Sequence, residues 1–101
     1  MKKVEGAIFE GAANHFVKAE SVGGKLYLTQ EALVFVSHAL NIQRHELVIP
    51  IAEIADLSLS KSLGIVPNGL TVHTSSGTEE KFVVNKRNTW IEKINALRNA
   101  Q

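Results

Sequence analysis

The side chains that could support catalysis or metal binding are few in this chain and scattered along it. Zinc requires several converging ligands, usually with short and regular spacing. The four imidazoles have no helical or short-motif spacing: His15, His38, His45 and His73. Cysteine is absent, which excludes a disulfide framework, a thiolate metal site and a cysteine nucleophile. We therefore expect surface or partly satisfied histidines, no metal site and no cofactor.

Nucleophilic and phosphate-binding motifs are missing as well. The sole aspartate, Asp56, falls on the polar side of an alternating segment, as do Ser58, Ser60 and Ser62. No G-x-S-x-G turn is present to expose a serine nucleophile, and no glycine run leads into a Lys-Ser/Thr pair. Because an active site needs convergent titratable groups, we predict that the chain is not an enzyme.

An apolar connection that follows a basic residue is the first candidate for binding. Lys61 precedes Leu63, Ile65 and Val66 in a segment between two predicted strands. Apolar side chains in a connection either contact a partner or a membrane surface, or fold back to fill the end of a barrel. We favour the second alternative, because a small barrel fills its mouth with side chains. The same two alternatives apply to Leu40 and Ile42.

A basic cluster near the predicted helix start is the second candidate. Lys81, Lys86 and Arg87 could together meet an anionic surface, although such clusters are more often only solvated. The formal net charge of the chain is +1, too low to indicate nucleic-acid binding. No apolar run is long enough to span a membrane, and no signal peptide is visible. We expect one domain over residues 1–101, in the cytoplasm, with peripheral membrane contact as an option.

Alternation of apolar and polar residues predicts the strands that must position these side chains. Residues 1–14 fit either a short strand or a loosely packed entry segment. Turns are expected at 21–24, where two glycines allow positive φ, at 67–69 and at 75–78. Pro50 should end a strand or lie on an edge. The predicted strands are 15–20, 25–29, 32–36 (apolar on both faces), 46–49, 55–60 (odd positions buried), 70–74 and 81–84.

The period changes near the C-terminus and predicts one amphipathic helix over 86–99. Asn85 is the expected N-cap, with Asn88 as the competing choice. A helix of this length is marginal alone, so its apolar stripe must dock on the strands. The stripe consists of Trp90, Ile91, Ile94 and Leu97. The six aromatic residues are spread along the chain and are expected to contribute to the core.

Several strings of the sequence carry a resemblance to a known family: residues 24–29, 33–35, 49–51 with Ile54, 63–70, and 82–84 leading to Trp90 and Ile91. Taken together, these strings resemble the GRAM domain of the pleckstrin-homology-like superfold, in its small bacterial stand-alone form. The resemblance extends from Gly11 to Leu97 and implies seven antiparallel strands in two nearly orthogonal sheets, forming a barrel capped by a C-terminal helix. The fold class is therefore mainly β with one α-helix.

The resemblance also implies a binding function, because such domains bind phosphoinositides or proteins. Pleckstrin-type phosphoinositide sites use a basic motif on the first two strands; Lys18 and Lys25 fit it, but Tyr27 replaces its arginine. We predict a non-catalytic binding or assembly module that contacts protein, including a second copy of itself. The alternative is peripheral binding to anionic lipid. The candidate contact residues are Lys18, Lys25, Lys61, Leu63, Ile65, Lys86 and Arg87.

Overall fold

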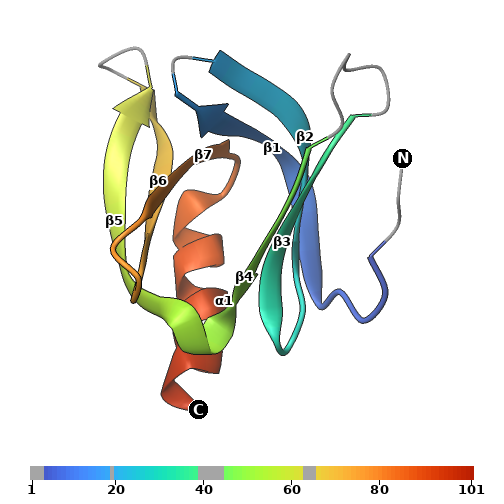
Figure 1. Ribbon diagram of the computed structural model, residues 1–101, viewed down its shortest axis with the longest axis vertical. Helices are drawn as coiled ribbons and strands as arrows, with labels where there is room; N and C mark the ends of the chain where they lie inside the picture. Colours follow the sequence, from blue (N-terminus) through green and yellow to red (C-terminus); the bar gives the residue numbers. More distant parts are fainter. Residues whose placement is uncertain (1–3, 19, 39–44, 63–65) are drawn as a thin grey trace.

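The computed structural model describes the backbone of residues 4–18, 20–38, 45–62 and 66–101, and their side chains except at 61, 62, 66 and 67. The chain forms seven strands, a short 3₁₀ helix and a C-terminal α-helix (Figure 1). In chain order these are β1 (Phe9–Val17), β2 (Glu20–Leu28), β3 (Ala32–Ser37), β4 (Glu46–Pro50), η1 (Ile51–Glu53), β5 (Ile54–Ser62), β6 (Val66–Thr74), β7 (Glu79–Val84) and α1 (Arg87–Asn99).

The seven strands form one antiparallel sheet in the order β4-β3-β2-β1-β7-β6-β5. Residues 13–16 of β1 pair with both β2 and β7, so β1 joins the two expected sheets into halves of a single hydrogen-bonded sheet. The sheet curls, and α1 lies on its concave side between the two halves (Figure 1). The predicted fold class, mainly β with one C-terminal helix, is confirmed. Strands β4 and β5 are the two edges.

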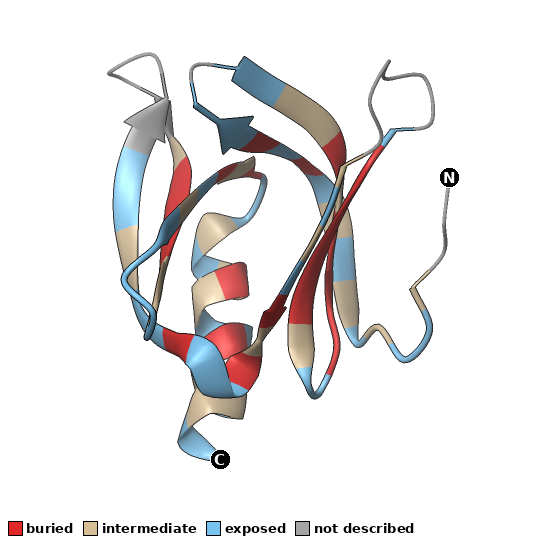
Figure 2. Cartoon of the chain, viewed as in Figure 1, coloured by how far each residue is buried: buried red, intermediate tan, exposed pale blue. Residues whose placement is uncertain are grey.

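The core fills the space between the concave face and α1 (Figure 2). Trp90 and Ile94 are fully enclosed, and Ile91 and Leu97 pack against the same cluster, which confirms the predicted stripe. The Trp90 ring meets that of Phe9 edge to face, with centroids 4.6 Å apart. Aromatic contacts of this geometry add to the stability that burial of the rings provides.

A second apolar cluster lies on the opposite, outer face of the sheet. Tyr27, Val34 and Val36 are buried there, under Val4 and Ala7 of the N-terminal segment. The prediction that β3 is apolar on both faces because both are covered is therefore confirmed.

The predicted turn at 21–24 is wrong. Gly23 and Gly24 lie inside β2, and the β1–β2 turn begins at Lys18, whose φ of 58° is left-handed. A two-residue hairpin needs positive φ, which lysine adopts at some cost in strain. Gly24 is required for close packing instead: a Cβ there would collide with the Val36 carbonyl and lie 2.7 Å from the Phe35 ring.

The predicted turn at 67–69 is also wrong, because these residues belong to β6. Gly69 pairs with Ser60 on one side and Val83 on the other. A Cβ on Gly69 would meet the Ser60 side chain and lie 2.7 Å from its carbonyl oxygen. As at Gly24, the glycine allows close strand approach rather than a reversal of the chain.

The N-cap prediction is wrong as well. Lys86, with a left-handed φ of 56°, precedes the helix and caps it without a side-chain hydrogen bond. Its carbonyl oxygen accepts hydrogen bonds from the N–H groups of Thr89 and Trp90, at 2.9 and 3.1 Å. Asn88 lies within the first turn of α1, and Asn85 precedes Lys86.

Exposure departs from the expected pattern at three apolar residues. Phe16 is 37% exposed and does not join the core, unlike the other aromatic residues. Ala55 is exposed and Leu59 is 55% exposed, so the odd positions of β5 are not all buried. The reason is the position of β5 at an edge of the sheet. Pro50, in contrast, ends the edge strand β4, as predicted.

Candidate binding surfaces

The predicted basic residues on the first two strands lie apart from each other. Lys18 is exposed in the β1–β2 turn. Lys25 lies in the middle of β2, where its Nζ is 3.4 Å from Glu10 Oε2 and 5.5 Å from the centroid of the Tyr27 ring. Both partners restrain the Lys25 ammonium on the outer face of the sheet.

The Arg87 side chain forms hydrogen bonds with the backbone of the sheet. Its Nη1 donates to the carbonyl oxygens of Ser60, at 2.7 Å, and Gly69, at 3.1 Å. At the other end of α1, Arg98 donates to the carbonyl oxygen of Ala55 at 2.6 Å. The two arginines thus attach both ends of the helix to the edge strand β5.

Three of the candidate residues are not described. The backbone of Lys61 lies near the end of β5, but its side chain is outside the described residues, as are Leu63 and Ile65. Leu40 and Ile42 are outside them too. Contact of these residues with a partner or a membrane stays a prediction.

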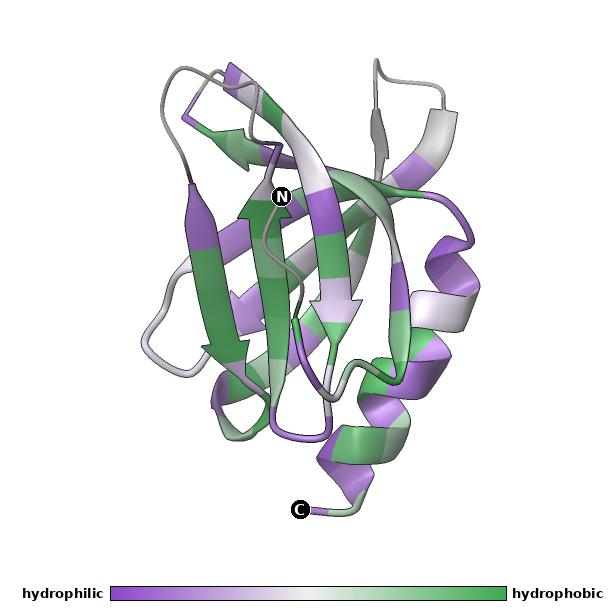
Figure 3. Cartoon of the chain, turned by 90° about the vertical axis from the view of Figure 1, so that its right-hand side faces the viewer, coloured by the Kyte–Doolittle hydropathy of each residue, from purple (hydrophilic) through white to green (hydrophobic). Residues whose placement is uncertain are grey.

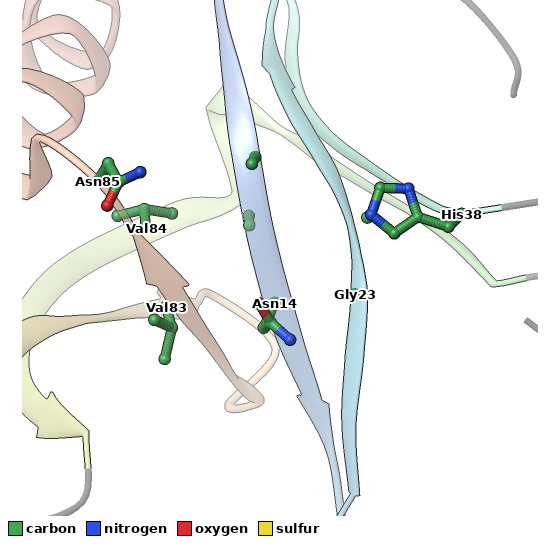
Figure 4. A pocket seen from close by; sticks show the side chains of 9 residues that line it. Asn14, Gly23, His38, Val83, Val84 and Asn85 are labelled. Carbon is green, nitrogen blue, oxygen red and sulfur yellow. The ribbon is translucent and has the colours of Figure 1, made fainter.

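A shallow hollow of about 180 Å³ lies over β1 where the side chains are small (Figure 4). Lys25 pairs with Ala12, which lines the hollow, and Lys86 follows Asn85, which also lines it. Two of the predicted basic residues are therefore neighbours of residues that line one hollow, Lys25 by strand pairing and Lys86 in sequence. The amide and imidazole groups of the hollow can donate and accept hydrogen bonds. The labelled lining residues are Asn14, Gly23, His38, Val83, Val84 and Asn85.

A second surface is apolar and lies on the outer side of β2, β3 and β4 (Figure 3). The register places Tyr27 opposite Val34, and Val34 opposite Val48, so these three form a row across the strands. Val48 at the edge is 52% exposed, and Ile8 beside the N-terminal segment is 50% exposed. We call this row, with Val36, the outer apolar face.

The sequence did not predict a pair of side-chain hydrogen bonds made by the two ring nitrogens of the buried His15. His15 is 3% exposed, and its Nε2 lies 2.8 Å from Glu80 Oε1 while its Nδ1 lies 2.7 Å from His45 Nε2. Burial lowers the pKa of His15, and the hydrogen-bonded Glu80 carboxylate offsets part of that decrease. At 2.7 Å the two imidazole nitrogens share a proton, not a metal ion. The one sequence signal for the burial of His15 is that Gly11, Ala13 and His15 are two residues apart, which puts all three on the same face of a strand.

Ser58, His73 and Glu79 form another row of contacts, on the outer face of β5, β6 and β7. Ser58 Oγ lies 2.7 Å from His73 Nε2, and His73 Nδ1 lies 4.0 Å from Glu79 Oε2. The order resembles a catalytic triad, but Ser58 lies within a paired strand and not on a sharp turn that would present it to a substrate. The arrangement is accounted for as cross-strand hydrogen bonding.

The curled seven-stranded sheet and its helix match solved structures of the pleckstrin-homology class. A human pleckstrin-homology domain, the N-terminal one of ARAP2, aligns with a TM-score of 0.73 at 16% identity, over 99% of this chain and 86% of that one. The Slm1-PH domain, solved in complex with phosphoserine, aligns with a TM-score of 0.66 at 13% identity, over 91% and 96% of the two chains. The C-terminal domain of an unknown protein from Leishmania infantum aligns with a TM-score of 0.78 at 19% identity, over 91% and 83%.

The GRAM domain family matches residues 7–98, and the chain belongs to this family. The resemblance stated from the sequence strings is confirmed at the level of the family and the fold. No curated protein matches the sequence. GRAM and pleckstrin-homology-like domains are binding modules for lipids and proteins. In the described part of the chain, no helix has the length and apolar character to cross a membrane.

Proposed function

We propose that this GRAM domain is a non-catalytic binding module that contacts protein through the outer apolar face. The observation that carries the proposal is Val48, whose side chain is 52% exposed at the end of an apolar row that is otherwise buried. An apolar strip that reaches an edge strand is a common feature of protein-binding surfaces.

The two edges of the sheet differ in a way that favours β4 as the contact strand. Near the two ends of strand β5, Arg87 donates a hydrogen bond to the carbonyl oxygen of Ser60 and Arg98 donates one to that of Ala55. A strand added at β5 would compete with these arginines. Strand β4 has one neighbour, β3, and the described residues of the N-terminal segment pack over Tyr27, Val34 and Val36.

Substitution of Val48 with aspartate tests the proposal. We expect Val48→Asp to reduce capture of binding proteins from the source cell about tenfold, a change of roughly 1.4 kcal/mol, because the charge would be desolvated in the contact. Leu59→Asp is the matched control, since Leu59 is exposed to a similar degree, 55%, on the opposite edge. Light scattering measures the molar mass of both variants and the wild type. If the partner is a second copy of the chain, the wild type should have the mass of a dimer and Val48→Asp that of a monomer.

Equal capture by the wild type and Val48→Asp would contradict the proposal, as would a selective loss with Leu59→Asp. Circular dichroism spectra are expected to be unchanged in both variants. The substituted positions are exposed, where replacements usually alter stability by about 0.5 kcal/mol or less.

A second candidate function is binding of an anionic headgroup at the hollow over β1. The observation that favours it is the position of Lys25 and Lys86 beside residues that line the hollow. A similar domain, Slm1-PH, has been solved with phosphoserine and with inositol-4-phosphate. Such binding would bring this protein to a membrane surface from the cytoplasm.

Co-sedimentation with anionic vesicles tests this candidate. We expect Lys25→Gln and Lys86→Gln each to weaken binding about fivefold, since a lysine near an anionic surface contributes about 1 kcal/mol. Lys93→Gln is the control, because Lys93 Nζ lies over the Phe9 ring, 5.2 Å from its centroid. Binding to neutral vesicles as strong as to anionic ones, or binding insensitive to salt, would exclude this candidate.

A further inference from the structure

The contacts of His15 limit the number of protons that the His15 and His45 imidazoles can carry together. The imidazole is enclosed by the rings of Phe82, 4.9 Å away between centroids, Phe35, 5.4 Å away, and His45, 4.8 Å away. At 3% exposure it has little access to water, so its two nitrogens depend on Glu80 and His45 for hydrogen bonds. An imidazole nitrogen left without a partner at this depth would destabilise the fold.

With both histidines neutral, one pattern of protons satisfies every contact. The Glu80 carboxylate only accepts, so His15 Nε2–H donates to Oε1. His15 Nδ1 is then an acceptor, and His45 Nε2–H donates to it across 2.7 Å. One added proton is tolerated, because either imidazole can carry it while a single hydrogen remains between the two rings.

A second proton cannot be accommodated. With both imidazoles charged, His15 Nδ1–H and His45 Nε2–H would point at each other, and two cations would be in direct contact. Both the hydrogen bond and the electrostatic balance would be lost. The remaining neighbours of His15 on β2, β3 and β7 are Val22, Phe35 and Phe82, which carry no charge. Among the described residues, Glu80 and His45 are thus the titratable groups that face it, and one carboxylate does not balance two cations.

His45 is the residue that can move. It is half-buried, immediately precedes the edge strand β4, and is held there by two bonds to Ser37. Ser37 N–H donates to the His45 carbonyl oxygen at 2.8 Å, and His45 N–H donates to Ser37 Oγ at 2.7 Å. His15, in contrast, lies within β1, which is paired on both sides at this position.

We propose that the His15–His45 contact is a proton-operated latch on the edge strand β4. The latch is closed when the histidine pair carries no proton or one proton, and the second proton opens it by expelling His45 from the inner face. Opening releases the first residues of β4 from β3 while β1, β2 and β7 stay paired. The proposal rests on the contact between His15 and His45, and it does not depend on the proposed function.

Amide hydrogen exchange of the full chain at two pH values tests the latch. Between pH 7 and about pH 4.5, below the ordinary histidine pKa of about 6.5, we expect protection at Leu47, which pairs with Phe35 of β3, to fall at least tenfold after correction for intrinsic rates. Protection at Leu70 and Val72 of β6 is expected to change less than twofold. Equal changes in β4 and β6, or no change in either, would overturn the proposal.

The variant His45→Gln supplies the matched comparison. Its amide can donate to His15 Nδ1 at neutral pH and turn to accept when His15 is protonated, so β4 should stay protected at both pH values. His73→Gln is the control, because His73 makes a similar 2.7 Å contact with Ser58 elsewhere. It should behave as the wild type does. A pH-dependent loss of β4 protection in His45→Gln equal to that of the wild type would overturn the proposal.

The imidazole ¹⁵N signals of the wild type give a result even if His45→Gln fails to fold. We expect protonation of the His15 ring to coincide with the loss of β4 protection. Protonation of His15 without any loss of β4 protection would overturn the latch.

Discussion

Substitution of Trp90 with alanine is expected to lower the free energy of unfolding by about 3–5 kcal/mol, the range for loss of a large aromatic side chain from a core. Trp90 is 1% exposed, and its ring contacts that of Phe9 at the start of β1. Its removal would leave a cavity between α1 and the concave face of the sheet. Urea denaturation followed by circular dichroism measures the change.

Glu92→Ala is the control for this prediction. Glu92 is exposed on the same helix, so its replacement is expected to change stability by about 0.5 kcal/mol or less. Similar denaturation midpoints for Trp90→Ala and Glu92→Ala would show that the helix is not docked through its Trp90 stripe.

Substitution of Gly24 with alanine is expected to destabilise the domain by about 3 kcal/mol, at the upper end of the usual range for overpacking. The added methyl group would lie against the Val36 carbonyl, 2.7 Å from Phe35 Cζ and 2.8 Å from Ser37 Cα. Two of these obstacles are backbone atoms of β3, which can yield only if the strands separate. Thermal unfolding monitored by calorimetry measures the loss.

The preceding glycine provides a matched control. A Cβ on Gly23 would meet the His38 ring at 3.4 Å, an ordinary van der Waals distance, and the Asn14 amide at 3.8 Å. Gly23→Ala should therefore be close to neutral. If the two alanine variants lose equal stability, the register between β2 and β3 is not the one described.

The strands and the helix could be predicted because their periodicity is local. Local sequence patterns located β3, β4, β7 and most of β5 and β6, and the spacing of Trp90, Ile94 and Leu97 located α1. The continuous apolar run of β3 also predicted that both of its faces are covered, since Val34 and Val36 are as apolar as Leu33 and Phe35. These are properties of single segments.

The glycines and the caps could not be predicted because their roles depend on neighbouring strands. A Gly-Gly pair permits both a turn and a close strand contact, and only the pairing with β3 distinguishes the two. Conversely, lysines occupy the two left-handed non-glycine positions found in the described part of the chain, Lys18 and Lys86, although glycine and asparagine adopt this conformation more readily. The true β1–β2 turn and the helix start therefore carry no local signal.

The binding surfaces were predicted only in part. Lys25 and Lys86 were proposed as contact residues for their charge, but the hollow that their neighbours line follows from the pairing of β1 with both β2 and β7. Val48 looked like an ordinary strand residue, and its exposure results from the place of β4 at an edge. The approach of His15 to Glu80 joins residues 65 positions apart in sequence, a separation that periodicity does not reach.

The most direct test of the account is amide hydrogen exchange of the domain with and without a captured protein partner. If the outer apolar face is the binding surface, binding should slow exchange in β4 and in the segment before β1, around Val48 and Ile8. Exchange along β5 should be unchanged. Protection confined to β5, with β4 unaltered, would contradict the account.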